Sequence, residues 1–353
     1  MTSSPTQAPV RFAAVGLDHA HVFGQIAGLL GAGAELVGIS SDDLESAVAT
    51  EVRRRYPDAP VIERPSELIT RDDVDLVVTA AVPDRRGPIA VEALRAGKDV
   101  VADKPGVITF DQLKEVRDAV EESGRFWSVT FSERFEVRAV ARAGELVRAG
   151  RIGRVVQTLG LGPHRIGDRG HLAGQGGRPA WFYDPSRYGG ILTDIASHQI
   201  DQFLWFTGAT SAEVALSTVG NFGNPQHPGF QDFGEMLLRS EEAQGYIRVD
   251  WYTPQGLPTW GDGRLMILGT EGYIELRKYV DIAGRDGTNH LFVVDQQGTE
   301  YIDCADAPLT YYPDLLRDVR EGSRTAAPQE HTFETMRLAL AAQQQATVRG
   351  TLR

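Results

Sequence analysis

Residues 11–21 read RFAAVGLDHAH, an apolar run that reaches Gly16 and is followed at once by the stretch 22–30, where apolar residues recur at helical spacing. A buried strand that passes through a glycine directly into a helix is typical of dinucleotide-binding folds. The reason is that backbone N–H groups at the start of the helix can hold a pyrophosphate. We therefore predict a nucleotide-binding turn at this point of the chain.

The alternation of short apolar runs and amphipathic stretches continues outward from this turn as far as residue 131. The pattern predicts further strands at 36–39, 61–62, 74–81, 99–102 and 126–131, and helices at 44–56, 66–69, 88–96 and 111–123. Continuous Val- and Ile-rich runs between helices indicate a parallel sheet covered on both faces. Residues 1–131 are therefore predicted to form an α/β, Rossmann-type dinucleotide-binding domain.

The rhythm changes after residue 131, where strands outnumber helices. A helix is expected at 138–149, strands at 155–161, 212–219, 233–238, 244–251, 264–268, 273–277 and 291–294, and helices again at 191–206 and in the last sixty residues. This segregation predicts an α+β domain over residues 132–353 with a large, mostly antiparallel sheet. Because few helices are available to cover that sheet, we expect its open face to pair with a second copy of the chain.

Composition narrows the class of protein. The 353 residues suggest about two domains, and 36 basic against 48 acidic residues give a formal charge of −12. That acidity argues against nucleic-acid or membrane partners. The single cysteine, Cys304, excludes an internal disulfide. No run approaches the ~18 apolar residues of a membrane span, and the first nine residues do not resemble a secretory signal. A cytoplasmic protein is expected.

The nucleotide turn departs from the usual G-x-G-x-x-G fingerprint, because only Gly16 is present and Asp18 and His21 occupy the other glycine positions. Asp18, His19 and His21 offer a carboxylate and two imidazoles that zinc could use. Side chains this close on a turn seldom converge, and no additional protein ligand is evident, so no metal is predicted. They are expected instead to line the cofactor groove or to cap the helix. The predicted cofactor-binding residues here are Gly16, Leu17, Asp18, His19, Ala20 and His21.

The end of the second strand bears on the choice of cofactor. Ser41, Asp42 and Asp43 offer no cation to a 2′-phosphate, which favours NAD over NADP, although NADP stays possible. Ser41 and Asp42 are the predicted contacts to the ribose. The two aspartates could equally serve only to cap the next helix.

Three residues carry the chemistry that we expect. Lys104 lies just past the carboxyl end of a predicted parallel strand, the edge at which open α/β sheets bind ligands. Asp194 and His198 are four residues apart on a predicted helix and therefore point to one face. Together a carboxylate and an imidazole can bind and deprotonate a hydroxyl. Taken alone, Lys104 could equally be a solvated surface lysine. Asp194 and His198 could equally be a hydrogen-bonded pair on one helix.

These segments together resemble the Gfo/Idh/MocA family of oxidoreductases. Asp103-Lys104-Pro105 is similar to the family's Glu-Lys-Pro motif, and Gly189-Gly190 followed by Asp194 and His198 is similar to its second signature. The segments 80–83 and 269–275 resemble the family's nucleotide loop and its late turn and strand. The loop 83–87 departs from the family by lacking a histidine. Its basic pair, Arg85-Arg86, either lies near the cofactor or, as we slightly favour, is solvated.

The resemblance implies an NAD(P)-dependent dehydrogenase that acts on a secondary hydroxyl of a sugar, inositol or related polyol. His198 would be the base because imidazole titrates near neutral pH. Asp194 would orient the substrate or the imidazole, and Lys104 would stabilise the alkoxide. Further cofactor contacts are expected at Ala81, Val82, Pro83, Asp103 and Lys104. The predicted substrate-binding residues are Arg134, His164, Trp181, Asp194 and His198.

Two other functions stay open from the sequence. One is a redox-neutral lyase or glycosidase that retains NAD and oxidises its substrate only transiently. The other is a non-catalytic sugar or nucleotide sensor on the same fold, which the degraded glycine fingerprint favours. The joint presence of Lys104, Asp194 and His198 argues against the sensor, because a binding module needs no proton chemistry.

Overall fold

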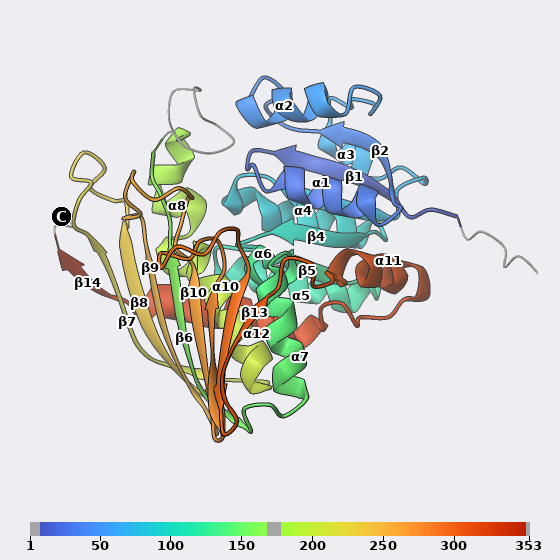
Figure 1. Ribbon diagram of the computed structural model, residues 1–353. Helices are drawn as coiled ribbons and strands as arrows, with labels where there is room; N and C mark the ends of the chain where they lie inside the picture. Colours follow the sequence, from blue (N-terminus) through green and yellow to red (C-terminus); the bar gives the residue numbers. More distant parts are fainter. Residues whose placement is uncertain (1–7, 168–177, 351–353) are drawn as a thin grey trace, which may run out of the picture. The chain divides into compact units, whose positions relative to one another are not determined.

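A computed structural model describes residues 8–167 and 178–350, and these residues form two compact units (Figure 1). Unit 1 contains the chain up to residue 103 together with 115–128 and 310–329. Unit 2 contains 104–114, 129–309 and the chain from residue 330. The units are thus interleaved along the sequence, which a single boundary near residue 132 does not describe. Within the described residues, no helix combines the length and apolar character needed to cross a bilayer.

The first sheet confirms the predicted Rossmann-type architecture. Its strands run in the order β2-β1-β3-β4-β5, and the pairs β1–β2, β1–β3 and β3–β4 are parallel. The elements are β1 (Arg11–Leu17), α1 (Val22–Gly31), β2 (Glu35–Ser40), α2 (Ala47–Arg55), α3 (Pro65–Ile69), β3 (Leu76–Ala80), α4 (Pro83–Arg95), β4 (Asp99–Asp103), α5 (Phe110–Ser123), β5 (Trp127–Thr130) and α11 (Tyr311–Glu321).

Two details of this half differ from the prediction. The strand expected at 61–62 is only an isolated bridge between Val61 and Ile39. Helix α4 begins at Pro83 rather than at residue 88, because proline is well tolerated in the first turn of a helix. The segment expected as a loop at 83–87 is therefore the start of α4, and Arg86 is buried there.

The second sheet has the order β13-β12-β11-β10-β6-β9-β8-β7-β14 and confirms the large, mostly antiparallel sheet. Only the pairs β6–β9 and β7–β14 are parallel among those described. The strands are β6 (Val155–Pro163), β7 (Glu213–Asn221), β8 (Phe233–Arg239), β9 (Gln244–Asp250), β10 (Arg264–Gly269), β11 (Gly272–Arg277), β12 (His290–Asp295), β13 (Gly298–Asp303) and β14 (Thr347–Gly350).

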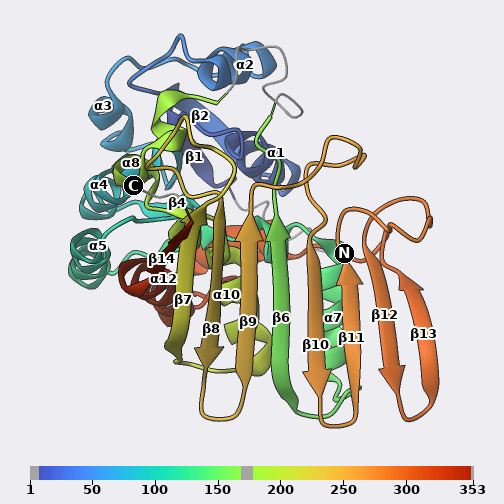
Figure 2. The same ribbon diagram turned by 90° about the vertical axis from the view of Figure 1, so that its left-hand side faces the viewer.

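One face of the second sheet carries helices. Figure 2 shows α7 (Arg138–Arg148), α10 (Ala196–Thr207) and α12 (Gln329–Gln345) along one side of the strands. Short elements complete the unit: α6 (Ser132–Phe135), η1 (Ala180–Tyr183), α8 (Pro185–Tyr188) and α9 (Ile191–Asp194). In β10, Leu265 and Ile267 are buried whereas Met266 and Leu268 are exposed. This period-2 pattern places one face of the strand on the core and the other in solvent.

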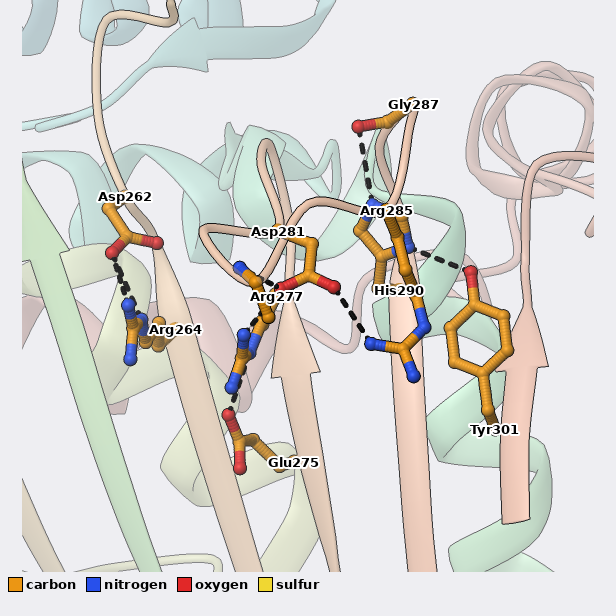
Figure 3. Close-up of polar contacts among 10 residues, drawn as sticks. Asp262, Arg264, Glu275, Arg277, Asp281, Arg285, Gly287, His290 and Tyr301 are labelled. Atoms are coloured by element: carbon orange, nitrogen blue, oxygen red, sulfur yellow. Dashed lines mark hydrogen bonds and ion pairs between the residues drawn. The ribbon is translucent and has the colours of Figure 1, made fainter. Parts of the chain in front are cut away.

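Ion pairs lie at the start of β10 and between the end of β11 and the loop that follows it (Figure 3). Asp281 binds both Arg277 and Arg285, and the backbone N–H of Ala283 together with these two guanidinium groups lowers the pKa of its carboxyl group. His290 Nε2 lies 3.3 Å from the carbonyl of Gly287, and its Nδ1 lies 2.8 Å from the Tyr301 hydroxyl. Since a carbonyl only accepts, Nε2–H is the donor to Gly287.

Candidate active site

Lys104 and Asp194 form an ion pair in unit 2. Lys104 Nζ donates to Asp194 Oδ1 at 2.8 Å, and the lysine is only 4% exposed. Lys104 directly follows β4, and Asp194 is the last residue of α9. The structure therefore brings these two predicted side chains into direct contact. An ammonium held in place by a carboxylate can stabilise a developing alkoxide.

His198 lies one turn beyond Asp194, but the helix is not continuous between them. Helix α9 ends at Asp194, Ile195 is a turn residue, and α10 begins at Ala196. Ser197 Oγ donates to the Asp194 carbonyl at 2.9 Å, and the His198 N–H donates instead to Ile195. The predicted single helix at 191–206 is thus two helices. A side-chain hydroxyl that competes for a carbonyl is a known cause of such a break.

His164 follows β6 in the same unit. Its Nδ1 lies 3.1 Å from the Gly162 carbonyl, and its ring lies 4.6 Å from that of Trp260 and 5.2 Å from that of Trp251. Loss of contact with water, and then the nearby charge of Lys104, lower the pKa of His164 to about 4. The imidazole is therefore uncharged at neutral pH. It can offer a substrate hydroxyl a neutral hydrogen-bonding partner next to aromatic faces.

Two other predicted substrate residues have different surroundings. Trp181 lies in η1, with its ring 6.3 Å from that of Phe182. The guanidinium of Arg134 is bound by both carboxylate oxygens of Asp201, at 2.6 and 2.7 Å. His331 Nε2 lies 2.8 Å from the same carboxylate. Because the fork of Arg134 is committed to Asp201, the geometry favours a structural role for Arg134 over contact with substrate.

The nucleotide turn belongs to unit 1 and is built on Gly16. Gly16 has a φ of +75°, and a Cβ there would lie 2.4 Å from the Cβ of Ala81. Only glycine combines that backbone conformation with such a close approach. The N–H groups of Asp18 and His19 both donate to the Ala80 carbonyl, at 3.1 and 2.9 Å. The turn is therefore packed against the end of β3, as a dinucleotide-binding turn requires.

The side chains in this turn fit a dinucleotide in spite of the missing glycines. Asp18, at the second glycine position, directs its carboxylate to the N–H of Val82 at 3.2 Å. The N–H of Leu17 donates to Ser41 Oγ at 3.2 Å. Among the described residues, the turn's N–H groups that make no hydrogen bond within the chain are those of Ala20 and His21. These groups precede α1, where the helix dipole favours an anion such as a pyrophosphate.

His19 and His21 converge on Asp103, a residue that the sequence analysis did not connect with them. Their Nδ1 atoms lie 2.7 and 2.8 Å from the two oxygens of the buried Asp103 carboxylate, and Arg86 pairs with the same group at 2.9 Å. Burial acts to raise the pKa of Asp103, but the charges of Arg86 and of the two histidines outweigh it and hold that pKa well below its usual value.

The contacts of His19 and His21 with Asp103 contradict the expectation that no additional protein ligand lies near the two histidines. An additional protein ligand does exist, because the candidate ligand atoms of His19, His21 and Asp103 lie within 4.8 Å of one another. Arg86 already neutralises the Asp103 carboxylate. The expectation that Arg85-Arg86 is simply solvated is wrong for Arg86, which is 1% exposed and also donates to the Ala81 carbonyl at 2.7 Å.

The remaining predicted cofactor residues lie at the ends of β2 and β3. Val82 precedes α4, and Pro83 is its first residue. Ser41 is buried, whereas Asp42 is exposed. The alternative that the aspartates cap the next helix is not what the structure has. The cap of α2 is Ser46, whose Oγ accepts from the N–H of Ala49 at 3.2 Å.

Comparison with known proteins identifies the class to which this fold and these sites belong. Residues 10–131 match a family model described as "Oxidoreductase family, NAD-binding Rossmann fold". Residues 140–275 match the GFO/IDH/MocA C-terminal domain. Inositol 2-dehydrogenase of Acidothermus cellulolyticus is 32% identical over 89% of this chain and 84% of its own length. The chain therefore belongs to the GFO/IDH/MocA oxidoreductase family.

Two further relatives agree with this assignment. An NAD(+)-dependent scyllo-inositol 2-dehydrogenase of Bacillus subtilis is 26% identical over 81% of this chain and 80% of its own length. The crystal structure of a protein from Erwinia carotovora atroseptica superimposes with a TM-score of 0.91, and the two sequences are 44% identical. The match covers 96% of this chain and 99% of that one. The chain is accordingly an NAD(P)-dependent dehydrogenase whose first domain binds the dinucleotide.

Proposed function

We propose that the protein oxidises a secondary hydroxyl of a sugar, an inositol or a related polyol, with NAD as hydride acceptor. The observation that carries the proposal is the buried Lys104–Asp194 ion pair, with His198 one turn away, in a chain whose N-terminal domain is an NAD-binding domain. The names of its relatives, which act on inositols, support the substrate class.

Each of the three residues has a role that its surroundings allow. His198 accepts the hydroxyl proton, because a neutral imidazole is a base near neutral pH. Lys104 donates a hydrogen bond to the oxygen as negative charge develops on it, and Asp194 holds the ammonium in place. The bound nicotinamide supplies the hydride acceptor. Residues 16–21, Ser41, Asp42, 81–83 and Asp103 are proposed to hold the cofactor, and His164 and Trp181 are proposed to shape the substrate site.

The direct test is a panel of inositols, sugars and deoxysugars with NAD and with NADP, followed by absorbance of the reduced cofactor. Stoichiometric NADH together with a ketone product supports the proposal. Conversion of substrate without net NADH would identify a redox-neutral enzyme that retains its cofactor. Binding of sugar without turnover would identify a sensor.

We predict that NAD binds more tightly than NADP. Asp42 and Asp43 are exposed next to Ser41 and would repel a 2′-phosphate, while Arg53, the nearby cation on α2, is paired with Glu45 at 3.2 Å. Calorimetric titration should show a preference of at least tenfold, which is about 1.4 kcal/mol. Asp42→Arg should narrow this preference. Tighter binding of NADP to the unmodified protein would contradict the prediction.

The uncovered face of the second sheet is proposed to pair with a second copy of the chain. Met266, Leu268 and Tyr273 are exposed on it, and Leu268 is the cross-strand neighbour of Tyr273. Adjacent exposed apolar side chains favour an interface. Light scattering at micromolar concentration should report a dimer or tetramer, and Leu268→Glu should lower the mass. A monomeric mass for the unmodified protein would refute this assembly.

A further inference from the structure

Another buried ion pair lies in unit 2, apart from Lys104–Asp194 and Arg134–Asp201. Glu133, in α6, is 2% exposed, and Lys278, which follows β11, is 1% exposed. Lys278 Nζ donates to Glu133 Oε2 at 2.5 Å, and Gln199 Nε2 donates to the same oxygen at 3.0 Å. Burying such a pair is costly, so its presence is weak evidence for a gain in stability.

The pair is attached to the helix that carries His198. Gln199 is the next residue on α10, and Gln202 Nε2 donates to the His198 carbonyl at 2.9 Å. Lys278 Nζ also donates to Gln202 Oε1 at 2.9 Å. Hydrogen bonds from Glu133 and Lys278 thus reach α10 at Gln199, which follows His198, and at Gln202, about one turn further on.

The neighbouring strand makes room for this arrangement. A Cβ at Gly160 or Gly162 of β6 would come within 2.8 or 2.9 Å of the Gln199 side chain. Glycine at both positions therefore lets Gln199 lie between β6 and Glu133. The ring of Phe131, two residues before Glu133, lies 6.4 Å from the His198 ring. The surroundings of Glu133 and of His198 are therefore continuous.

Two acceptors in this network have no donor. Glu133 Oε1 and Gln199 Oε1 are both buried and have no hydrogen-bond partner among the described residues. Burial acts to raise the pKa of Glu133, but the charge of Lys278, followed by that of His198, lowers that pKa to about 2. The group is therefore a carboxylate. An anion with an unsatisfied buried oxygen stabilises any positive charge or N–H donor that forms beside it.

We propose that Glu133 is a positioning residue that stabilises the His198 imidazolium formed during turnover, and that Lys278 limits the strength of this effect. The inference rests on the proposed function. In that step the substrate O–H bond breaks and an N–H bond forms on His198, while the hydride leaves carbon for the oxidised nicotinamide and a carbonyl results. Glu133 takes no proton, and the proton on His198 later passes to solvent.

The charges around His198 set opposite expectations for the two partners. Lys104 is paired with Asp194, and Lys278 is paired with Glu133. His164 is neutral. Arg134 is paired with Asp201, which lies further along α10. Removal of the Glu133 charge leaves Lys278 to disfavour the imidazolium. Removal of the Lys278 charge leaves Glu133 to favour it. The basicity of His198 should therefore fall when the Glu133 charge is removed and rise when the Lys278 charge is removed.

The experiment is the pH profile of kcat/KM for Glu133→Gln and Lys278→Met. Alcohol oxidation requires the unprotonated base, so activity rises with pH through the pKa of that base. We expect Glu133→Gln to move this limb about one unit to lower pH and to reduce the plateau of kcat roughly tenfold. Lys278→Met should move the limb about one unit to higher pH. Calorimetry should show an unchanged Kd for NAD in both variants.

The controls separate this role from a purely structural one. Glu275→Gln removes a carboxylate that pairs with Arg277 on β11 and should leave the profile unmoved. If Lys278→Met fails to fold because Glu133 is left unpaired, the double variant Glu133→Gln/Lys278→Met removes both charges and should fold. Its limb should lie close to that of the unmodified enzyme. Limbs that stay in place, or that move in the same direction in both single variants, would overturn the proposal.

A second readout does not depend on the substrate. NMR titration of the His198 imidazole in the NAD complex, assigned by loss of its signal in His198→Gln, should give a lower pKa in Glu133→Gln and a higher one in Lys278→Met. If no panel compound is oxidised but these shifts occur, the proposed function fails and the role of Glu133 stands. If oxidation occurs without the shifts, the role of Glu133 fails alone.

Discussion

Lys104→Ala should reduce kcat/KM on the true substrate by about 10²–10³, the usual loss on removing one preorganised group that stabilises developing charge. The lysine is almost fully buried and held at 2.8 Å by Asp194, so its ammonium is fixed before substrate binds. His198→Ala should cost about 10²–10⁴, as expected for a lost general base. Steady-state kinetics at several pH values would measure both effects.

The double variant gives the sharper result. Residues that act as a unit are strongly non-additive, so Lys104→Ala/His198→Ala should be little worse than the poorer single variant. Lys98→Ala is a matched control, because that lysine is also largely buried but donates to the Arg71 carbonyl in unit 1. It should retain kcat. The Kd for NAD should change only modestly in His198→Ala. Full activity in either single variant would refute the mechanism.

Arg134→Leu should be among the most destabilising single substitutions in unit 2. Asp201 is fully buried, and removal of Arg134 leaves its carboxylate with His331 as its remaining ionisable partner. Breaking a buried pair in this way typically costs about 3–5 kcal/mol. Urea denaturation at pH 7, followed by tryptophan fluorescence, would measure the loss. Arg134→Leu/Asp201→Leu should recover much of it, because no buried charge is left unmatched.

The pH dependence of this effect has a definite sign. Burial acts to raise the pKa of Asp201, but Arg134 and then His331 outweigh it, so the pKa in the folded protein lies below that in the unfolded chain. The ion pair therefore contributes stability above the unfolded pKa of about 3.9 and loses it as the pH falls through the folded value. The difference between the unmodified protein and Arg134→Leu should shrink toward low pH. A difference that grows on acidification would contradict the assignment.

Sequence periodicity was sufficient for the Rossmann-type half, because β1, β3 and β4 are buried on both faces and their sequences show it. It did not reveal β13, whose residues GTEYID are mostly exposed at the edge of the sheet and carry little apolar signal. Strand β14 was missed for the same reason. Edge strands depend on the partner strand more than on their own composition.

In the candidate site, too, some residues could be predicted from the sequence and others could not. Lys104, Asp194 and His198 could be predicted because each lies in a motif with recognisable spacing. Glu133 and Lys278 are 145 residues apart and carry no local signal, so only the fold brings them together. Arg86 was missed because a polar segment was read as loop when its proline begins α4. Buried ion pairs of this kind depend on tertiary geometry, which a single sequence does not encode as a pattern.

The return of residues 310–329 to unit 1 has a consequence for synthesis. Gln329 bonds both the N–H and the carbonyl of Trp127, at 2.9 and 2.8 Å, and Tyr311 lies 3.0 Å from the Ser128 hydroxyl. A Cβ on Gly28 would meet the ring of Tyr312 at 2.2 Å, so α1 is shaped to receive that ring. A chain that emerges from the ribosome N-terminus first cannot complete this unit until residue 329 is outside. Nearly the whole nine-stranded sheet is translated before then. A fragment that ends at residue 131 lacks α11 and would expose the apolar surface that packs against this helix in the full chain.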